Sequence, residues 1–220
     1  MIGVFDSGIG GLSVLEALRA LLPHAAFTYV ADGEHAPYGE RDEAFVTQRS
    51  LAVTQQLVEG HGASLVVVAC NTATAAAIHH LREAFPRVRF VGIEPALKPA
   101  LLVSRNKRIG VMATERTLAS AKFGALLQSV RHEAQFILQP CNGLAHAIER
   151  GEAPRVRALC GEYWKAIRSR ADVDTLVLGC THYPLEEDLL RDTVGPDVAL
   201  VEPGPAVARR VAQLLAAEPA

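Results

Sequence analysis

The 220-residue sequence predicts an α/β protein made of two similar, pseudo-symmetric α/β domains with mainly parallel sheets. Short apolar runs rich in β-branched residues alternate with longer segments of helical periodicity, which is typical of parallel strands joined by helical crossovers. These runs are apolar on both faces, as strands that are covered by helices on each side should be. The same order of elements occurs a second time in the chain, so we expect one folding unit used twice.

The candidate elements follow this alternation in chain order. Strands are predicted at residues 2–5, 27–31, 65–69 and 89–93 in the first half, and at 109–112, 135–139, 175–179 and 198–201 in the second. Helices are predicted at residues 11–22, 42–60, 73–84, 116–130, 143–150, 154–170, 185–193 and 205–216. Glycine and proline residues lie between these segments, where they end helices and strands.

The repeat is clearest at two strand ends that carry cysteine. Residues 65–72 read Leu-Val-Val-Val-Ala-Cys-Asn-Thr and residues 175–182 read Thr-Leu-Val-Leu-Gly-Cys-Thr-His, so Cys70 and Cys180 occupy equivalent places. Ligands of parallel sheets bind outside the carboxyl ends of the strands. We therefore expect the two halves to face each other at these ends, with the active site in the cleft between the domains.

The length suits two domains of about 100 residues each. We expect the first domain to comprise residues 1–94 together with a returning C-terminal helix at 205–220, and the second to comprise residues 95–204. The join falls near residues 94–107. Four basic residues gather there and are most simply interpreted as the solvated surface of a linker: Lys98, Arg105, Lys107 and Arg108.

The composition argues against several classes of function. The net charge is −2 and the pI is about 6.4, so no basic surface indicates a nucleic-acid partner. The longest apolar run is far too short to span a membrane. Four cysteines in a chain of this length do not indicate a disulfide framework, and the first strand begins at once, which leaves no room for a signal peptide. We therefore expect a cytoplasmic protein.

The two matched cysteines are the strongest candidates for chemistry. A single strand cysteine is usually buried and inert, because free cysteine packs like a small hydrophobic residue. Here the arrangement occurs twice, and each cysteine precedes a predicted helix, whose N-terminus favours the reactive thiolate form. Cys70 and Cys180 are therefore predicted to be two functional thiols on facing half-molecules, suited to a two-sided proton transfer.

Small polar residues follow both thiols, namely Asn71, Thr72 and Thr74 after the first, and Thr181 and His182 after the second. Such residues cap helices, and the same positions can help to hold a carboxylate. His182 is close enough in sequence to Cys180 to tune that thiol or to shuttle its proton. The two residues also match half of a zinc site, but no further ligands stand at a recognisable spacing, so no metal is expected.

Two loops supply further candidates. The first strand ends in Asp-Ser-Gly-Ile-Gly-Gly at residues 6–11, a turn that matches neither a dinucleotide fingerprint nor a phosphate-binding loop. Asp6 either caps the following helix or serves as a carboxylate beside one thiol. The sequence Pro-Tyr-Gly at residues 37–39 is typical of a turn, and its tyrosine is a candidate wall of the cleft.

Together these motifs resemble those of the glutamate racemases, in the aspartate/glutamate racemase superfamily. The resemblance rests on Asp-Ser-Gly after the first strand, Pro-Tyr-Gly at 37–39, Ala-Cys-Asn-Thr-Ala-Thr at 69–74 and, most specifically, Gly-Cys-Thr-His-Tyr-Pro at 179–184. It runs from the first strand to the last helix. It implies a racemase that needs no cofactor, supplies D-glutamate for peptidoglycan synthesis and is compatible with a homodimer.

The resemblance also implies roles for individual residues. Cys70 and Cys180 would be the two acid/base thiols, with Asp6 and His182 assisting them. Glu149, in the string His-Ala-Ile-Glu-Arg-Gly, stands where the family has an assisting carboxylate, and Glu152 nearby is the alternative. The residues implied in substrate binding are Asp6, Ser7, Pro37, Tyr38, Gly39, Asn71, Thr72, Thr114, Thr181 and His182.

The expected reaction is a two-base proton transfer at the α-carbon of glutamate. One thiolate removes the α-proton and the opposite thiol delivers a proton to the other face, so each sulfur should approach the α-carbon within about 3–3.5 Å. Two alternatives stay open, namely a racemase for aspartate or another amino acid, and a small-ligand binding protein without turnover. A redox dithiol is disfavoured because the chain has no Cys-x-x-Cys motif.

Overall fold

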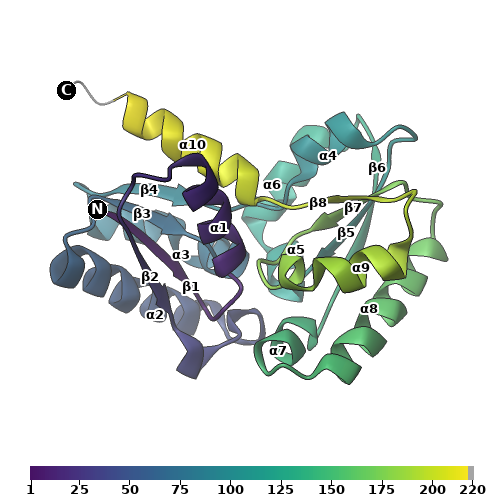
Figure 1. Cartoon of the computed structure of the whole chain (residues 1–220), viewed down its shortest axis with the longest axis horizontal. Helices are drawn as coiled ribbons and strands as arrows, with labels where there is room; N and C mark the ends of the chain where they lie inside the picture. Colours follow the sequence, from purple (N-terminus) through teal and green to yellow (C-terminus); the bar gives the residue numbers. More distant parts are fainter. Residues whose placement is uncertain (218–220) are drawn as a thin grey trace.

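Two four-stranded parallel sheets form the framework of the protein, one in each half of the chain (Figure 1). The computed structural model describes residues 1–217, so residues 218–220 of the predicted segment 205–220 lie outside the described part. The strand order is β2-β1-β3-β4 in the first sheet and β6-β5-β7-β8 in the second. Every neighbouring pair is parallel, which confirms the predicted α/β class with two similar units.

Each predicted strand is found, with its ends shifted by no more than one residue. The strands are β1 Ile2–Asp6, β2 Phe27–Ala31, β3 Leu65–Val68, β4 Arg89–Gly92, β5 Arg108–Ala113, β6 Gln135–Pro140, β7 Thr175–Leu178 and β8 Ala199–Val201. The register repeats as well, because Ile2 pairs with Phe27 and Leu65. In the second sheet Ile109 pairs with Phe136 and Thr175. The central strands β1 and β5 are therefore equivalent.

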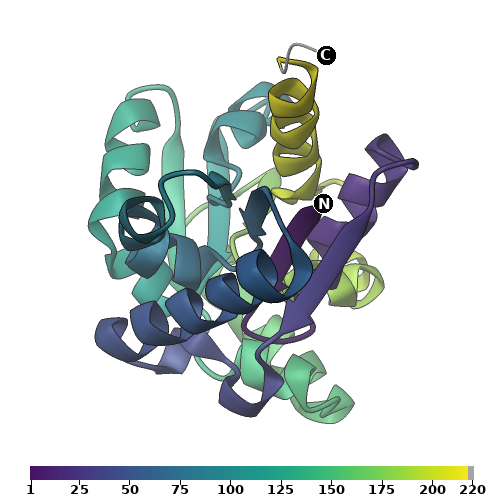
Figure 2. The same ribbon diagram turned by 90° about the vertical axis from the view of Figure 1, so that its left-hand side faces the viewer.

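Helices cover both faces of each sheet (Figures 1 and 2). The α-helices are α1 Leu12–Leu21, α2 Glu43–Gln55, α3 Asn71–Ala84, α4 Leu97–Val103, α5 Glu115–Ala119, α6 Ala121–Val130, α7 Leu144–Glu149, α8 Ala153–Arg168, α9 Glu187–Val194 and α10 Gly204–Ala216. Shorter helical turns are η1 Gly33–His35, η2 Tyr38–Glu40, η3 Gln56–Gly60 and η4 Tyr183–Glu186. None of the helices in residues 1–217 has the length and apolar character that a bilayer crossing requires.

Each sheet packs a separate hydrophobic core on each of its faces. In the first half, α2 and α3 cover one face, and α1 and α10 cover the other. Leu18 of α1 shares the second core with Val207 and Val211 of α10, so the C-terminal helix returns to the first half (Figure 1). The division of the chain into 1–94 with 205–220, and 95–204, stays a prediction.

The segment near residues 94–107 contains a helix that the sequence did not predict. It is not simply a solvated linker, because it contains α4, which buries Leu97, Ala100 and Leu101 against the second sheet. These residues are spaced three and four apart, which places them on one face of a helix. The helix is short and contains Pro99, so its periodicity is weak in the sequence. The basic residues Lys98, Arg105, Lys107 and Arg108 are exposed, as expected.

Other helices differ from the prediction at their ends. The predicted helix 116–130 is divided into α5 and α6 at Ser120, which has extended backbone angles and caps α6 through the N–H of Phe123. The predicted helix 185–193 is α9, which is preceded by the 3-10 turn η4. The second cysteine is therefore not followed directly by an α-helix, as the first one is.

The packing of α1 on α10 predicts how the C-terminal helix contributes to stability. Leu18→Ala should lower the free energy of unfolding by about 2–5 kcal/mol, because it removes a fully buried side chain from the shared core. Leu21→Ala, in the same helix but 48% exposed, should change it by no more than about 0.5 kcal/mol. Urea denaturation of the two variants measures both values, and equal effects would contradict this packing.

Candidate active site

Loops that follow the strands of both sheets meet where the two halves touch. The Thr181 hydroxyl of the second half donates a hydrogen bond to Oδ1 of Asp6 at 3.3 Å. The hydroxyl oxygens of Thr72 and Thr114, again from opposite halves, lie 3.2 Å apart. The carboxyl ends of β1 and β3 therefore approach those of β5 and β7. This junction brings together the residues that the sequence singles out.

Cys70 ends the strand β3 and caps the helix α3. Its Sγ accepts a hydrogen bond from the N–H of Ala73 at 3.4 Å, and its thiol donates to Oγ of Ser7 at 3.9 Å. The helix begins at Asn71, earlier than predicted, because the cysteine itself takes the capping position. The thiol thus lies at the positive end of a 14-residue helix.

Cys180 occupies the equivalent place after β7, with a different set of neighbours. Its Sγ lies 3.8 Å from Nδ1 of His182, and Nε2 of His182 lies 2.6 Å from Oε2 of Glu149. The imidazole therefore connects the thiol to a carboxylate. Glu152, the alternative carboxylate, instead pairs with Arg155 at 3.2 Å.

The glycine-rich turn after β1 packs directly on this second group of residues. The N–H of Ile9 donates to Oε2 of Glu149 at 3.0 Å, and a Cβ atom at Gly8 would overlap the same carboxylate. A Cβ atom at Gly10 would overlap the imidazole of His182. Glycine is therefore required because the backbone of one half must touch the side chains of the other.

Burial raises the pKa values of two groups in the first half, Asp6 and Cys70. Desolvation raises the pKa of Asp6, although His182 and the N–H of Gly8 act in the opposite direction. Burial also raises the pKa of the Cys70 thiol well above its usual value, and the negative charge of Asp6 raises it further. Asp6 and Cys70 are thus two adjacent groups that both hold protons more tightly than usual.

The second-half groups form an ion pair. Burial lowers the pKa of His182, but its hydrogen bonds to Cys180 and Glu149 outweigh that effect and raise the pKa to about 10. Burial raises the pKa of Glu149, but the hydrogen bonds from His182 and from the N–H of Ile9 bring it below its usual value. Cys180 therefore faces an imidazolium at neutral pH, whereas Cys70 faces a buried carboxyl group.

The two thiols are close enough to each other to interact electrostatically. The charge of Cys180 is among the causes that raise the pKa of Cys70. Both thiols are almost enclosed, with 5% of Cys70 and 7% of Cys180 exposed. A reactant held between them would be largely removed from water, which strengthens electrostatic interactions with it.

Five other predicted binding residues lie at or beside the junction of the two halves. Ser7, Asn71, Thr72, Thr114 and Thr181 are all buried. The side-chain amide of Asn71 has no hydrogen-bond partner at either polar atom among the described residues. Most buried polar groups are paired, so this amide is a candidate contact for a ligand.

The turn at residues 37–39 lies against the second half, but its tyrosine is turned away from solvent. A Cβ atom at Gly39 would lie 2.8 Å from Cγ2 of Thr114. The Tyr38 side chain is fully buried and its hydroxyl donates to Oδ2 of Asp32 at 2.6 Å. Pro37 is also buried. The turn therefore contacts the site through its backbone rather than through the tyrosine hydroxyl.

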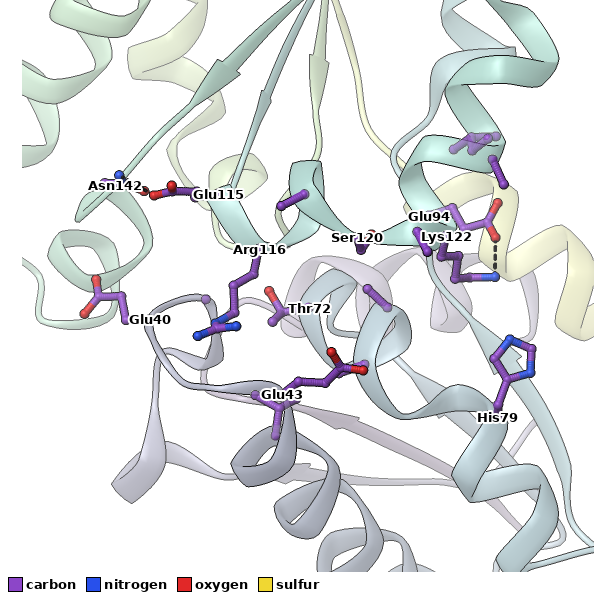
Figure 3. A pocket seen from close by; sticks show the side chains of 18 of the residues that line it. Glu40, Glu43, Thr72, His79, Glu94, Glu115, Arg116, Ser120, Lys122 and Asn142 are labelled. Carbon is purple, nitrogen blue, oxygen red and sulfur yellow. Dashed lines mark hydrogen bonds and ion pairs between the residues drawn. The ribbon is translucent and has the colours of Figure 1, made fainter.

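A groove with a volume of about 1160 Å³ opens between α2 and α3 of the first half and α5 and α6 of the second (Figure 3). Gly39 and Thr72 line it, and neither thiol does. Figure 3 shows Arg116 extending into the groove from the second half, opposite Glu40 and Glu43. The groove thus reaches two predicted binding residues from the solvent side.

Sequence reasoning assigned no role to two residues that adjoin the site. Tyr29, on β2, donates from its hydroxyl to the carbonyl of Gly8 at 2.6 Å and so holds the glycine-rich turn. Arg49, in α2, forms two hydrogen bonds with Asp32. The sequence gives no sign of these pairings, because contacts between separate elements leave no local pattern.

Comparison with known proteins shows the family to which the chain belongs. Residues 12–211 match the family model described as Asp/Glu/Hydantoin racemase. The glutamate racemase of Methylococcus capsulatus is 49% identical over 99% of this chain and 80% of the relative, and that of Ectopseudomonas mendocina is 47% identical over 97% and 81%. The chain belongs to the Asp/Glu/Hydantoin racemase family.

Two solved structures of glutamate racemases are similar in fold to this chain. The glutamate racemase of Escherichia coli, in complex with L-glutamate and the activator UDP-MurNAc-Ala, has a TM-score of 0.87 and 36% identity, and the match covers all of this chain and 83% of that one. The glutamate racemase of Francisella tularensis, in complex with D-glutamate, has a TM-score of 0.81 and 27% identity over 97% and 80%.

The raised pKa of His182 predicts a pH dependence of stability. The imidazolium should stabilise the folded state fully below pH 6.5, its ordinary pKa, and this contribution should disappear as the pH rises through about 10. The difference in unfolding free energy between wild type and His182→Asn should therefore shrink over this range. Denaturant titrations at several pH values measure it, and a difference that is constant with pH would contradict the pairing.

Proposed function

We propose that the protein is a cofactor-independent glutamate racemase that interconverts L- and D-glutamate through Cys70 and Cys180. The observation that carries the proposal is a pair of enclosed thiols, one from each half, each with its own acid–base neighbour. Relatives named glutamate racemase, similar over nearly the whole chain, support glutamate as the substrate. We further propose that the D-glutamate supplies peptidoglycan synthesis.

The substrate is proposed to bind between the thiols with its polar groups on the neighbouring side chains. The free amide of Asn71 offers both a donor and an acceptor, which suits the carboxylate and the ammonium group of an amino acid. The positive end of α3 favours a carboxylate at this position. The groove in Figure 3 is the proposed route to this position, since Gly39 and Thr72 line it.

The reaction begins with a proton shift from the Cys70 thiol to Asp6. The raised pKa of Asp6 makes this carboxylate a better base than an exposed one. The Cys70 thiolate then takes the proton of the α-carbon, so that an S–H bond forms while the C–H bond breaks. The electron pair stays on the α-carbon and spreads into the α-carboxylate, where the hydrogen-bond donors of the site stabilise it.

Cys180 completes the inversion from the opposite face. Its thiol transfers a proton to the α-carbon, and the thiolate that is left faces the imidazolium of His182. Glu149 holds that imidazolium in place through the 2.6 Å contact with Nε2. In the reverse direction Cys180 is the base and Cys70 the acid, so the two sides exchange roles between enantiomers.

The first test of this function removes one sulfur at a time. Cys70→Ser and Cys180→Ser should each lower racemisation by about a hundredfold or more, because each thiol serves one face of the substrate. Racemisation of L- and D-glutamate is followed by circular dichroism, and exchange of the α-proton by NMR in deuterated water. Cys160→Ser, a buried cysteine in α8, is the matched control and should retain activity.

These measurements also separate the competing functions. A wild-type chain that binds glutamate but never exchanges its α-proton would be a binding protein. Faster turnover of aspartate than of glutamate would identify a racemase with another substrate. Near wild-type racemisation by either serine variant would refute the two-thiol reaction.

The unequal surroundings of the thiols predict a directional effect. Asp6→Asn should lower kcat most in the direction in which Cys70 is the base. His182→Asn should lower kcat most in the opposite direction, because each residue serves the nearer thiol. Initial rates from each pure enantiomer, together with solvent deuterium incorporation, measure this asymmetry. Small and equal effects in both directions would leave only a structural role for the two residues.

A further inference from the structure

Asp32 is the centre of a hydrogen-bond network beside the site. It follows β2 directly, and its side chain is only 8% exposed. Nδ1 of His35 lies 3.0 Å from Oδ1, and the Tyr38 hydroxyl donates to Oδ2 at 2.6 Å. Arg49 donates from Nε at 2.9 Å and from Nη2 at 2.8 Å, one bond to each carboxylate oxygen. Three side chains thus converge on one carboxylate.

This geometry keeps Asp32 ionised and fixed. Burial raises the pKa of its carboxyl group, but the hydrogen bonds from Arg49, Tyr38 and His35 outweigh burial and bring the pKa below its usual value. A two-point contact with a guanidinium also defines the orientation of the carboxylate plane, which a lysine could not do. The network therefore holds α2, where Arg49 lies, against the end of β2.

The same residue connects two parts of the proposed site. The backbone N–H of Asp32 donates to the carbonyl of Asp6 at 3.1 Å, which ties it to the strand end that carries the buried carboxyl. Its side chain holds Tyr38, and the next residue, Gly39, contacts Thr114 of the other half. Asp32 thus joins the Asp6 strand end to the turn at residues 37–39.

We propose that Asp32 and Arg49 are positioning residues, which hold the 37–39 turn at the distance from Thr114 that substrate binding requires. The proposal rests on the proposed function, in which Gly39 of this turn and Thr72 line the route to the bound glutamate. The tyrosine hydroxyl is already occupied by Asp32, so the turn must act through its backbone. Backbone groups cannot adjust by changing rotamer, so their placement depends on what anchors the loop.

This role predicts a change in substrate binding rather than in the proton transfer itself. Neither Asp32 nor Arg49 has a hydrogen bond to a thiol, so kcat should stay within about threefold of wild type. A displaced turn should instead raise KM for glutamate, by about tenfold or more, because misplacement of about 1 Å at a binding site weakens interactions strongly. A residue with only a structural role would lower stability and the active fraction without changing KM.

The test measures KM and kcat for glutamate, with the midpoint of thermal unfolding, in four variants. Asp32→Asn and Arg49→Met should both raise KM. Arg49→Lys keeps the charge but loses the two-point contact, and should be intermediate. Tyr38→Phe removes only the hydroxyl and should raise KM less. The double variant Asp32→Asn/Arg49→Met should be no worse than the more severe single one, because both changes break the same contact.

Asp174→Asn is the matched control. Asp174 is another loop-anchoring carboxylate, which accepts hydrogen bonds from the Ser104 hydroxyl at 2.6 Å and from the N–H of Arg105 at 2.8 Å. It precedes β7 and so lies at the end of that strand away from Cys180. Its substitution should lower stability and leave KM unchanged.

The outcomes distinguish this inference from the function on which it rests. A wild-type chain without racemisation would refute both. If the wild type is active and the folded Asp32 and Arg49 variants keep KM within about twofold, the positioning role alone is wrong. If the two stronger variants do not fold, Arg49→Lys and Tyr38→Phe decide, and an unchanged KM in both would overturn it.

Discussion

Glu149 accepts hydrogen bonds from both halves of the protein, and the arrangement of the site depends on this carboxylate. The N–H of Ile9 reaches it from the first half, and His182 reaches it from the second. Each half has its own hydrophobic cores, so apolar packing within the halves does not determine how they meet. Burying an unpaired charge costs free energy, so Glu149 and His182 must stay within contact distance of each other. The glycines at 8 and 10 leave the space that this contact needs.

The duplicated fold gives its two thiols equivalent positions but unequal surroundings. Cys70 caps a long helix and adjoins the buried Asp6. Cys180 precedes a 3-10 turn that contains Pro184, and it adjoins a charged imidazole. In the proposed reaction one sulfur must lose a proton while the other supplies one. Two different acid–base partners can support these opposite states, whereas two identical surroundings would favour the same state at both sulfurs.

The site is assembled mostly from loops, and the structure restrains each loop with a separate contact. Tyr29 holds the glycine-rich turn through the carbonyl of Gly8, and Asp32 holds the turn that contains Tyr38. Both anchoring residues lie on β2 or directly after it, so an outer strand of the first sheet supports two walls of the site. Loop residues carry function well when a rigid scaffold positions them in this way.

The sequence by itself determined the strands, their duplication and the placement of both thiols at strand ends, because these depend on local periodicity and on the connection rules of parallel sheets. It did not reveal α4, whose few buried residues and Pro99 conceal a short helix. It also did not show that His182 contacts Glu149 while Glu152 pairs with Arg155, or that Arg49 contacts Asp32. Only the tertiary structure decided these points, since residues far apart in the chain leave no local pattern before packing brings them together. Whether a carboxylate meets a histidine or an arginine is settled by which helices and loops lie side by side.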